Sequence, residues 1–239
     1  MIRPNVRASF GRREAELLLS LAGPGGEERL REEGIDALLD DAQLVRKLLQ
    51  RGGIEVAPAP LVFYLLVRQA LLEREIYDRQ FADYTAAMLL EFGRIGRRPP
   101  TADGLPDTIY LADILEEIGR ARGEREFLLR QHLGNVALWL AGVFPDFITT
   151  RVQRRGAPPI SYYDEMGAEG FRSAASMEFA LRYDLGDLLL RFADQFSNVR
   201  SALNGLSDAL FFPNPPDAVE RVLREVTDRF NRNERRYWA

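Results

Sequence analysis

The chain of 239 residues contains a single histidine, His132, and no cysteine. Histidine is the side chain best suited to proton transfer near neutral pH, because its unperturbed pKa is about 6.5. Thiolate catalysis, disulfides and cysteine-ligated metal sites all require a residue type that this chain lacks. Any chemistry that depends on an imidazole must therefore take place around His132.

Polar side chains interrupt an otherwise apolar segment around this histidine. They are Arg130, Gln131, His132 and Asn135. His132 and Asn135 are three residues apart, so they share one face if the segment is helical. A polar group on a buried helix face needs a hydrogen-bond partner. We therefore take His132, Asn135 and Arg130 as candidate ligand-binding residues and expect a neighbouring helix to face them.

Asp83 and Tyr84 interrupt a second apolar segment and are the expected partners of His132, with Glu73 and Arg68 as the second choice. One interpretation is a polar pocket between helices that binds a small molecule. The other is a hydrogen-bonded core network that fixes the register of the helices. We favour the core network, and we keep Asp83 and Tyr84 as candidate ligand-binding residues under the first interpretation.

The common motifs for metal, nucleotide and hydrolase chemistry are missing from the sequence. A zinc-protease helix needs two histidines, and the chain has neither a phosphate-binding loop nor a Gly-x-Ser-x-Gly turn. Asp36, Asp40 and Asp41 are the candidates for a carboxylate site that binds Mg²⁺ or Ca²⁺. Acids at this spacing are common by chance, so we expect no metal and no cofactor. Enzymatic activity stays open, but the sequence favours a protein that is not an enzyme.

The segment from Arg151 to Tyr163 combines three arginines with two tyrosines around a proline loop. Single-stranded nucleic acid binds to such a combination through phosphate pairing and base stacking. Three arginines are few for that purpose, and the whole chain carries a formal net charge of −4. We therefore do not expect nucleic acid as a partner. We expect the arginines to cap or salt-bridge a long loop, with one tyrosine in the core.

Charge is unevenly distributed at the two ends of the chain. Residues 11–41 contain nine acids and four bases. This stretch is either a solvated surface or a docking surface for a basic partner. The C-terminal tail is basic and aromatic, with Arg235, Arg236, Tyr237 and Trp238. These four residues are candidate interaction residues, because exposed aromatic and arginine side chains anchor protein interfaces, although the aromatic pair fits equally well as packing onto the protein's own core.

Apolar residues recur at three- and four-residue spacing between clusters of proline and glycine, which is the helical period. We expect the long segment Leu61–Phe92 to break near Tyr77–Arg79. No extended stretch has the alternation of a strand. The sequence therefore predicts an all-α, single-domain bundle of about eight to ten helices over residues 1–239, with residues 1–52 as a peripheral acidic helical segment. The clearest helical segments are Arg12–Leu21, Ile35–Gln50, Leu61–Phe92 and the strongly apolar Phe127–Phe144.

The features above favour a non-enzymatic helical protein that works by binding another protein, in an interaction or regulatory role. The alternative is a small-molecule-binding protein or enzyme with a polar pocket around His132. We expect a soluble, cytoplasmic protein without a membrane span, because no apolar run approaches the roughly 18–20 residues that a bilayer requires. The sequence leaves assembly into a homo-oligomer open, and it shows no resemblance to a named family that would identify functional residues.

Overall fold

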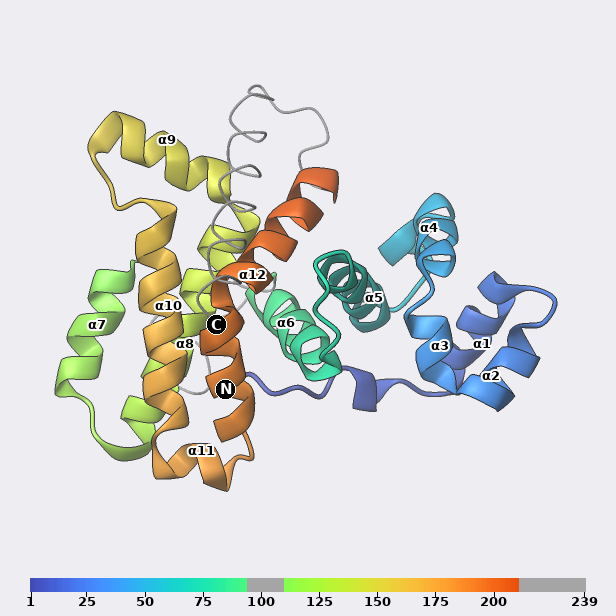
Figure 1. Cartoon of the computed structure of the whole chain (residues 1–239), viewed down its shortest axis with the longest axis horizontal. Helices are drawn as coiled ribbons and strands as arrows, with labels where there is room; N and C mark the ends of the chain where they lie inside the picture. Colours follow the sequence, from blue (N-terminus) through green and yellow to red (C-terminus); the bar gives the residue numbers. More distant parts are fainter. Residues whose placement is uncertain (94–109, 211–239) are drawn as a thin grey trace. The chain divides into compact units, whose positions relative to one another are not determined.

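The computed structural model describes residues 1–93 and 110–210 (Figure 1). The regular elements within these ranges are twelve α-helices and two short 3₁₀-helices, without a strand. Ten of the α-helices have seven residues or more. The predicted all-α, multi-helix fold class is therefore confirmed.

The chain divides into two compact units, Met1–Asp107 and Thr108–Ala239. Residues 1–52, the expected peripheral segment, belong to the same unit as the helices within residues 59–92. The expectation of one single domain stays a prediction. The first unit contains η1 (Arg7–Ser9), α1 (Arg12–Ala22), α2 (Gly26–Glu33), α3 (Ile35–Leu39), α4 (Ala42–Gln50), η2 (Gly53–Glu55), α5 (Ala59–Leu72) and α6 (Arg79–Phe92). The second contains α7 (Leu111–Arg120), α8 (Gly123–Val143), α9 (Pro145–Arg155), α10 (Ile160–Ala175), α11 (Glu178–Arg182) and α12 (Gly186–Leu210).

The break expected near Tyr77–Arg79 separates α5 from α6. Helix α5 ends at Leu72, and the turn that follows places Glu75 at a φ of 60°, in the left-handed region. Asp78 then caps α6, because its side chain accepts a hydrogen bond from the Gln80 backbone N–H at 2.9 Å. The expected break is therefore confirmed, and an N-terminal cap fixes where α6 begins.

The segment Ile35–Gln50, which the apolar stripe predicts as one helix, forms two helices. Helix α3 ends at Leu39 and α4 begins at Ala42. Asp41 between them has an extended backbone, and its side chain accepts a hydrogen bond from the Gln43 backbone N–H at 2.8 Å. The prediction of one helix was wrong because an aspartate that caps a new helix does not disturb the hydrophobic period.

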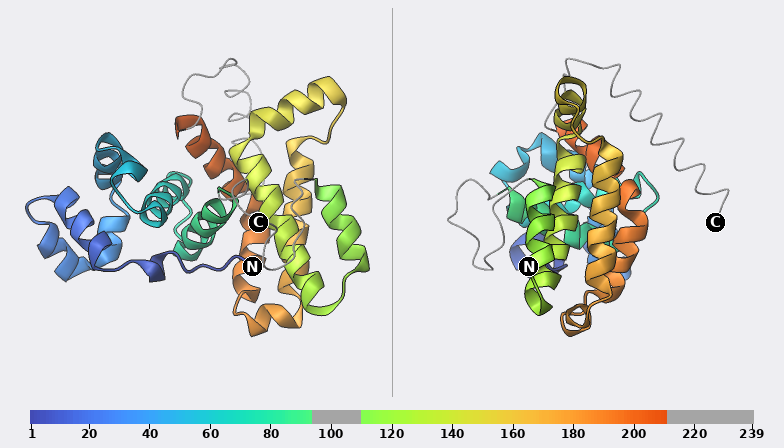
Figure 2. Two further views of the ribbon diagram at one scale, coloured as in Figure 1. Left: turned by 180° about the vertical axis from the view of Figure 1, so that it is seen from behind. Right: turned by 90° about the vertical axis from the view of Figure 1, so that its left-hand side faces the viewer.

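Helices α8, α10 and α12 pack against one another and form the core of the second unit (Figures 1 and 2). Glycines allow their close approach. A Cβ atom on Gly134 of α8 would lie 2.5 Å from the Phe171 ring of α10, and one on Gly167 of α10 would lie 2.1 Å from the Phe196 ring of α12. These positions accept no larger residue without a shift of the packed rings.

Helix α8 is buried at thirteen of its positions, which agrees with the strongly apolar character of this segment in the sequence. Among the described helices, none is by itself long and apolar enough to span a membrane. Helices α8 and α9 meet that criterion only as a pair, and the chain bends by 89° between them.

Side chains of α12 cap the C-terminal end of α8 by donating hydrogen bonds to its last carbonyls. The last carbonyls of a helix lack partners within it, and Pro145 has no N–H to donate here. The Asn204 amide nitrogen donates to the carbonyls of Ala141 and Gly142 at 2.7 and 2.8 Å, and the Ser207 hydroxyl donates to that of Val143 at 2.7 Å. These buried hydrogen bonds hold the junction from which α9 turns away from the bundle.

Candidate functional site

Phe147 and Arg151 of helix α9 lie together with Tyr110, the residue that precedes α7, so that two exposed aromatic rings meet one half-buried arginine. Phe147 is 49% exposed and Tyr110 is 54% exposed. Arg151 lies one turn after Phe147 on the same face. Its guanidinium carbon is 5.4 Å from the centroid of the Phe147 ring and 5.8 Å from that of the Tyr110 ring. Both distances fall within the range of cation–π attraction, so Arg151 holds the two rings together.

Arg151 has no acidic partner within residues 1–93 and 110–210. Its Nε atom is buried and makes no hydrogen bond to the described part of the chain. An arginine of the same unit shows the usual arrangement, since Arg200 donates two parallel hydrogen bonds to Asp164 at 3.0 and 3.1 Å. Arg151 therefore presents a guanidinium group whose hydrogen-bonding capacity is not used by a carboxylate in the described structure.

Two further arginines extend this arrangement toward the end of α9. Arg154 and Arg155 are exposed, and no described acid pairs with either. Residues 147, 151, 154 and 155 have the spacing of a single helix face. No aspartate or glutamate occurs from residue 147 to residue 163. We call Tyr110, Phe147, Arg151, Arg154 and Arg155 the α9 surface.

The loop and helix that follow α9 border this surface. Tyr163 is 9% exposed and packs edge-on against the Tyr162 ring, with the centroids 5.8 Å apart. Burial raises the pKa of Tyr163, and the positive charge of Arg151 partly opposes that rise. The Tyr163 phenol is therefore neutral at physiological pH. Its position confirms the expectation that one tyrosine of this segment enters the core.

The expectation that these arginines cap or salt-bridge a long loop was wrong, because they lie on a helix and pair with no described acid. Residues 145–155 form helix α9, which ends at Gly156 with a φ of 59°. A left-handed glycine of this kind is a common helix terminus. The helix explains why Phe147 and the three arginines share one face. A search for helical spacing among arginines and aromatic residues would have found this face, except for Tyr110.

A second charged group ties together three elements of the first unit. Arg68 of α5 is 2% exposed and donates to both carboxylate oxygens of Asp40, at 2.7 and 3.1 Å. It also donates to the Tyr77 carbonyl at 2.9 Å, while Arg79 of α6 donates to Asp40 at 2.7 Å. Burial alone would raise the pKa of Asp40, but the hydrogen bonds and charges of Arg68 and Arg79 outweigh it and lower the pKa.

This group also accounts for the carboxylates that were considered for a metal. Asp36 pairs with Arg7 at 3.1 Å and with Arg79 at 3.6 Å, and Asp41 pairs with Arg29 at 2.7 Å. Within the described ranges, no group of three or more histidine, aspartate or glutamate side chains is arranged to hold a metal ion. The carboxylates of this region join helices through arginines.

Asp83, an expected partner of His132, receives a hydrogen bond from the N-terminal segment. The Arg7 backbone N–H donates to its Oδ1 atom at 2.7 Å. Burial raises the pKa of Asp83, and hydrogen bonds from the backbone of Arg7 and Val6 partly oppose this. Tyr84 beside it is fully buried. Both residues lie in the first unit and His132 in the second, so their pairing stays a prediction.

The polar residues of α8 lie in different surroundings. Asn135 is buried at 2% exposure, and His132 is half-buried. Arg130 pairs with Glu126, one turn earlier on the same helix, with a nitrogen–oxygen distance of 2.7 Å. The candidate ligand-binding residues of this helix therefore do not all face one space, and a pocket around His132 stays a prediction.

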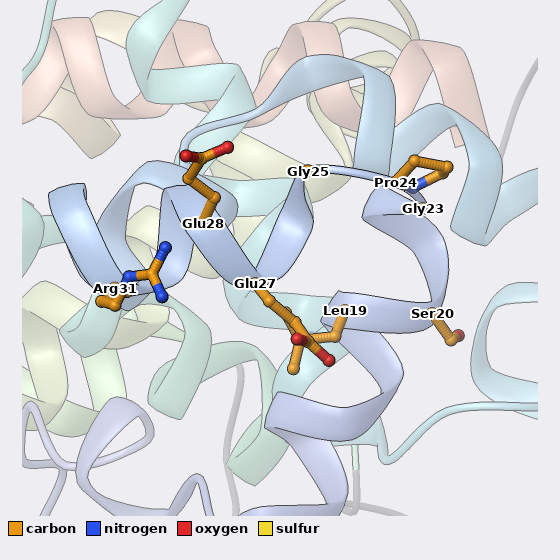
Figure 3. Close-up of a pocket in the computed structure, with 8 residues that line it drawn as sticks. All are labelled: Leu19, Ser20, Gly23, Pro24, Gly25, Glu27, Glu28 and Arg31. Carbon is orange, nitrogen blue, oxygen red and sulfur yellow. The ribbon is translucent and has the colours of Figure 1, made fainter.

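A depression of about 680 Å³ lies on the hairpin between α1 and α2 (Figure 3). It belongs to the acidic stretch of residues 11–41. Its labelled side chains spread around the hairpin and do not converge on one point, and its charged residues, Glu27, Glu28 and Arg31, are exposed. The depression therefore lacks the converging polar groups of a ligand site.

The remaining interaction candidates, Arg235, Arg236, Tyr237 and Trp238, lie outside the described residues. Comparison with known proteins found no matching family model, no matching curated protein and no matching solved structure. The α9 surface is thus the candidate functional site, on the strength of its own geometry.

Proposed function

We propose that this protein binds another protein through the α9 surface and does not act as an enzyme. One observation carries the proposal: the exposed rings of Phe147 and Tyr110 are held against Arg151, which has no acidic partner in the described chain. A partner that covers the exposed rings gains the free energy of burying apolar surface. A carboxylate of that partner would also form strong hydrogen bonds with the guanidinium group of Arg151.

The residue types of this surface are those that dominate protein interfaces. Tyrosine and arginine are enriched among the residues that contribute most to binding, and aromatic residues in general are enriched where acids are depleted. The absence of acids from residue 147 to residue 163 fits that composition. The cation–π contacts of Arg151 also restrict its motion before binding, which lowers the entropy lost on association.

The scaffold beneath the α9 surface supports the same proposal. Pro145 and Ile148 of α9 are buried, so the helix is anchored to its unit. Asn204 and Ser207 hold the end of α8 from which α9 begins. A contact surface on an anchored helix keeps its geometry better than one on a loop.

Site-specific photo-crosslinking in cells tests this proposal. A benzoyl-phenylalanine is placed at position 147, and at position 181 as the control. Leu181 is 82% exposed in the same unit, so both probes face solvent. We expect one discrete crosslinked protein at position 147 that is absent at position 181. The same products at both positions, or none at position 147, would contradict the proposal.

A further inference from the structure

We propose that the α9 surface recognises an acidic segment of its protein partner, in which carboxylates pair with the arginines of α9 and an apolar side chain covers Phe147. This inference rests on the proposed function and adds the chemistry of the partner. It is motivated by three arginines on one helix face, Arg151, Arg154 and Arg155, with no acid to pair with in the described residues.

Two buried arginines of the described residues, Arg68 and Arg200, show what a guanidinium group binds when an acid is within reach. Arg68 holds Asp40 and Arg200 holds Asp164, each through two parallel hydrogen bonds between 2.7 and 3.1 Å. The planar guanidinium fork matches the two oxygens of a carboxylate. Arg154 and Arg155 have the same chemistry, are exposed and pair with no described acid, and Arg151 beside them also lacks a described acidic partner.

The spacing of the residues on the α9 surface determines how the matching residues of the partner segment are spaced. Arg151 and Arg155 are four residues apart, which is about 6 Å along a helix. Alternate side chains of an extended peptide are separated by about 6.6 Å. Two acids at alternate positions therefore match these two arginines. Phe147 lies a further turn away, so an apolar residue two positions beyond the acids reaches its exposed ring.

A protein partner fits this surface better than nucleic acid. A strand of nucleic acid binds through many phosphate contacts, whereas α9 offers three arginines in a chain with a net charge of −4. Bases also need free ring faces for stacking. The guanidinium group of Arg151 already lies over the rings of Phe147 and Tyr110.

Fluorescence anisotropy with three synthetic probes tests the inference on the full chain. The first probe is an extended peptide with one phenylalanine followed by three glutamates at alternate positions. The second carries glutamine in place of each glutamate. The third is a single-stranded oligothymidine of equal length. We expect the acidic peptide to bind at least about tenfold more tightly than the glutamine peptide, because charged partners strengthen hydrogen bonds to guanidinium groups.

Variants of the protein then locate the binding. Arg151→Gln, and separately the exposed pair Arg154→Gln with Arg155→Gln, should each weaken binding of the acidic peptide about tenfold or more, by removal of charge-assisted hydrogen bonds. Arg182→Gln is the matched control, because Arg182 also lies over a ring, 4.8 Å from the centroid of Phe179, on another helix. It should leave the affinity unchanged.

The two proposals fail in distinguishable ways. Equal binding of both peptides, tighter binding of the oligothymidine, or an equal loss in the Arg182→Gln control would overturn the inference about the partner's chemistry. A crosslink at position 147 that survives in the Arg154→Gln, Arg155→Gln variant would overturn it too, while leaving the proposed function intact. Absence of the crosslink at position 147 in the otherwise unmodified protein would overturn the proposed function itself.

Discussion

Arg200 of α12 holds Asp164 of α10 with two parallel hydrogen bonds, from Nε at 3.0 Å and from Nη2 at 3.1 Å. Its third nitrogen donates to Asn204 at 2.9 Å. Asn204 in turn donates to the last carbonyls of α8. A continuous set of polar contacts therefore links α10, α12 and the end of α8 inside an otherwise apolar core.

Removing one partner of this pair should be strongly destabilising. Asp164→Asn leaves the Arg200 charge buried without its counter-ion, so we expect the free energy of unfolding to fall by about 3 kcal/mol. Urea denaturation measures the change. Arg120→Gln is the control, because Arg120 and Glu116 form a solvent-exposed pair that should contribute about 0.5 kcal/mol or less. Equal effects of the two variants would show that Arg200 is not held in the core as described.

The glycines of the second unit allow a test of its packing. Gly167→Ala places a Cβ atom 2.1 Å from the Phe196 ring, so we expect a loss of at least about 1–3 kcal/mol in stability. Gly119→Ala on the exposed face of α7 meets nothing within 4 Å and should be neutral or slightly stabilising. Thermal unfolding of both variants checks this contrast. A Gly167→Ala protein as stable as the Gly119→Ala protein would be inconsistent with the packing of α10 on α12.

Two aspartates of the first unit should respond to pH in opposite directions. The pKa of Asp40 is lowered in the folded state, so its contribution to stability is present above its unfolded pKa of about 3.9 and is lost as the pH falls below that value. The pKa of Asp83 is raised, so its ionisation opposes folding as the pH rises above about 3.9.

Urea unfolding at pH 3 and pH 7 separates these two contributions. Compared with the unmodified protein, Asp40→Asn should reduce the gain in stability between the two pH values, and Asp83→Asn should increase it. The amide introduced by Asp83→Asn still offers an oxygen to the Arg7 backbone N–H, so we expect this variant to be the milder change at pH 7. A pH dependence that moves the same way in both variants would contradict the opposite pKa shifts.

Alanine substitutions on α8 test whether the histidine belongs to the core. Asn135 is buried and His132 is half-buried, so Asn135→Ala should lower the free energy of unfolding by about 1–3 kcal/mol and His132→Ala by about 1 kcal/mol. Chemical denaturation gives both values. If His132→Ala leaves stability unchanged, a polar pocket around His132 becomes the better interpretation.

The C-terminal tail competes with α9 as the interaction surface. Deletion of residues 232–239 removes Arg235, Arg236, Tyr237 and Trp238, and we expect the crosslink from position 147 to persist in the truncated protein, because α9 carries its own aromatic and basic residues. Circular dichroism controls for the helix content. Loss of the crosslink with unchanged circular dichroism would assign the interaction to the tail.

The hydrophobic periodicity predicted the fold class. It did not predict features that depend on single polar side chains, such as a helix cap or an ion pair. The break between α5 and α6 coincides with a run of charged residues from Glu73 to Arg79, which the sequence shows directly. Asp41, in contrast, divides a predicted helix through one cap that leaves the apolar stripe intact. Ser161 and Asp164 have the spacing of a capping box at the start of a helix. Helix α10 begins at Ile160 without a side-chain cap, and Asp164 pairs with Arg200 instead.

The candidate site was harder to predict because some of its contacts join residues that are far apart in the sequence. Phe147 and Arg151 are one helical turn apart, and that relationship is visible in the sequence once the helix is recognised. Tyr110 lies 41 residues before Arg151 in the sequence, and no local pattern around Tyr110 predicts its contact with Arg151. Arg200 is likewise separated from Asp164 by 36 residues. Tertiary pairs of this kind arise from packing and leave no periodic signal.

The closure of the last α8 carbonyls by Asn204 and Ser207 has a kinetic consequence for recognition. A helix whose starting point is fastened to the core meets a partner in the same shape that it keeps after contact. Binding should then be a single bimolecular step without a separate conformational change. The observed association rate should rise in proportion to partner concentration and reach no plateau.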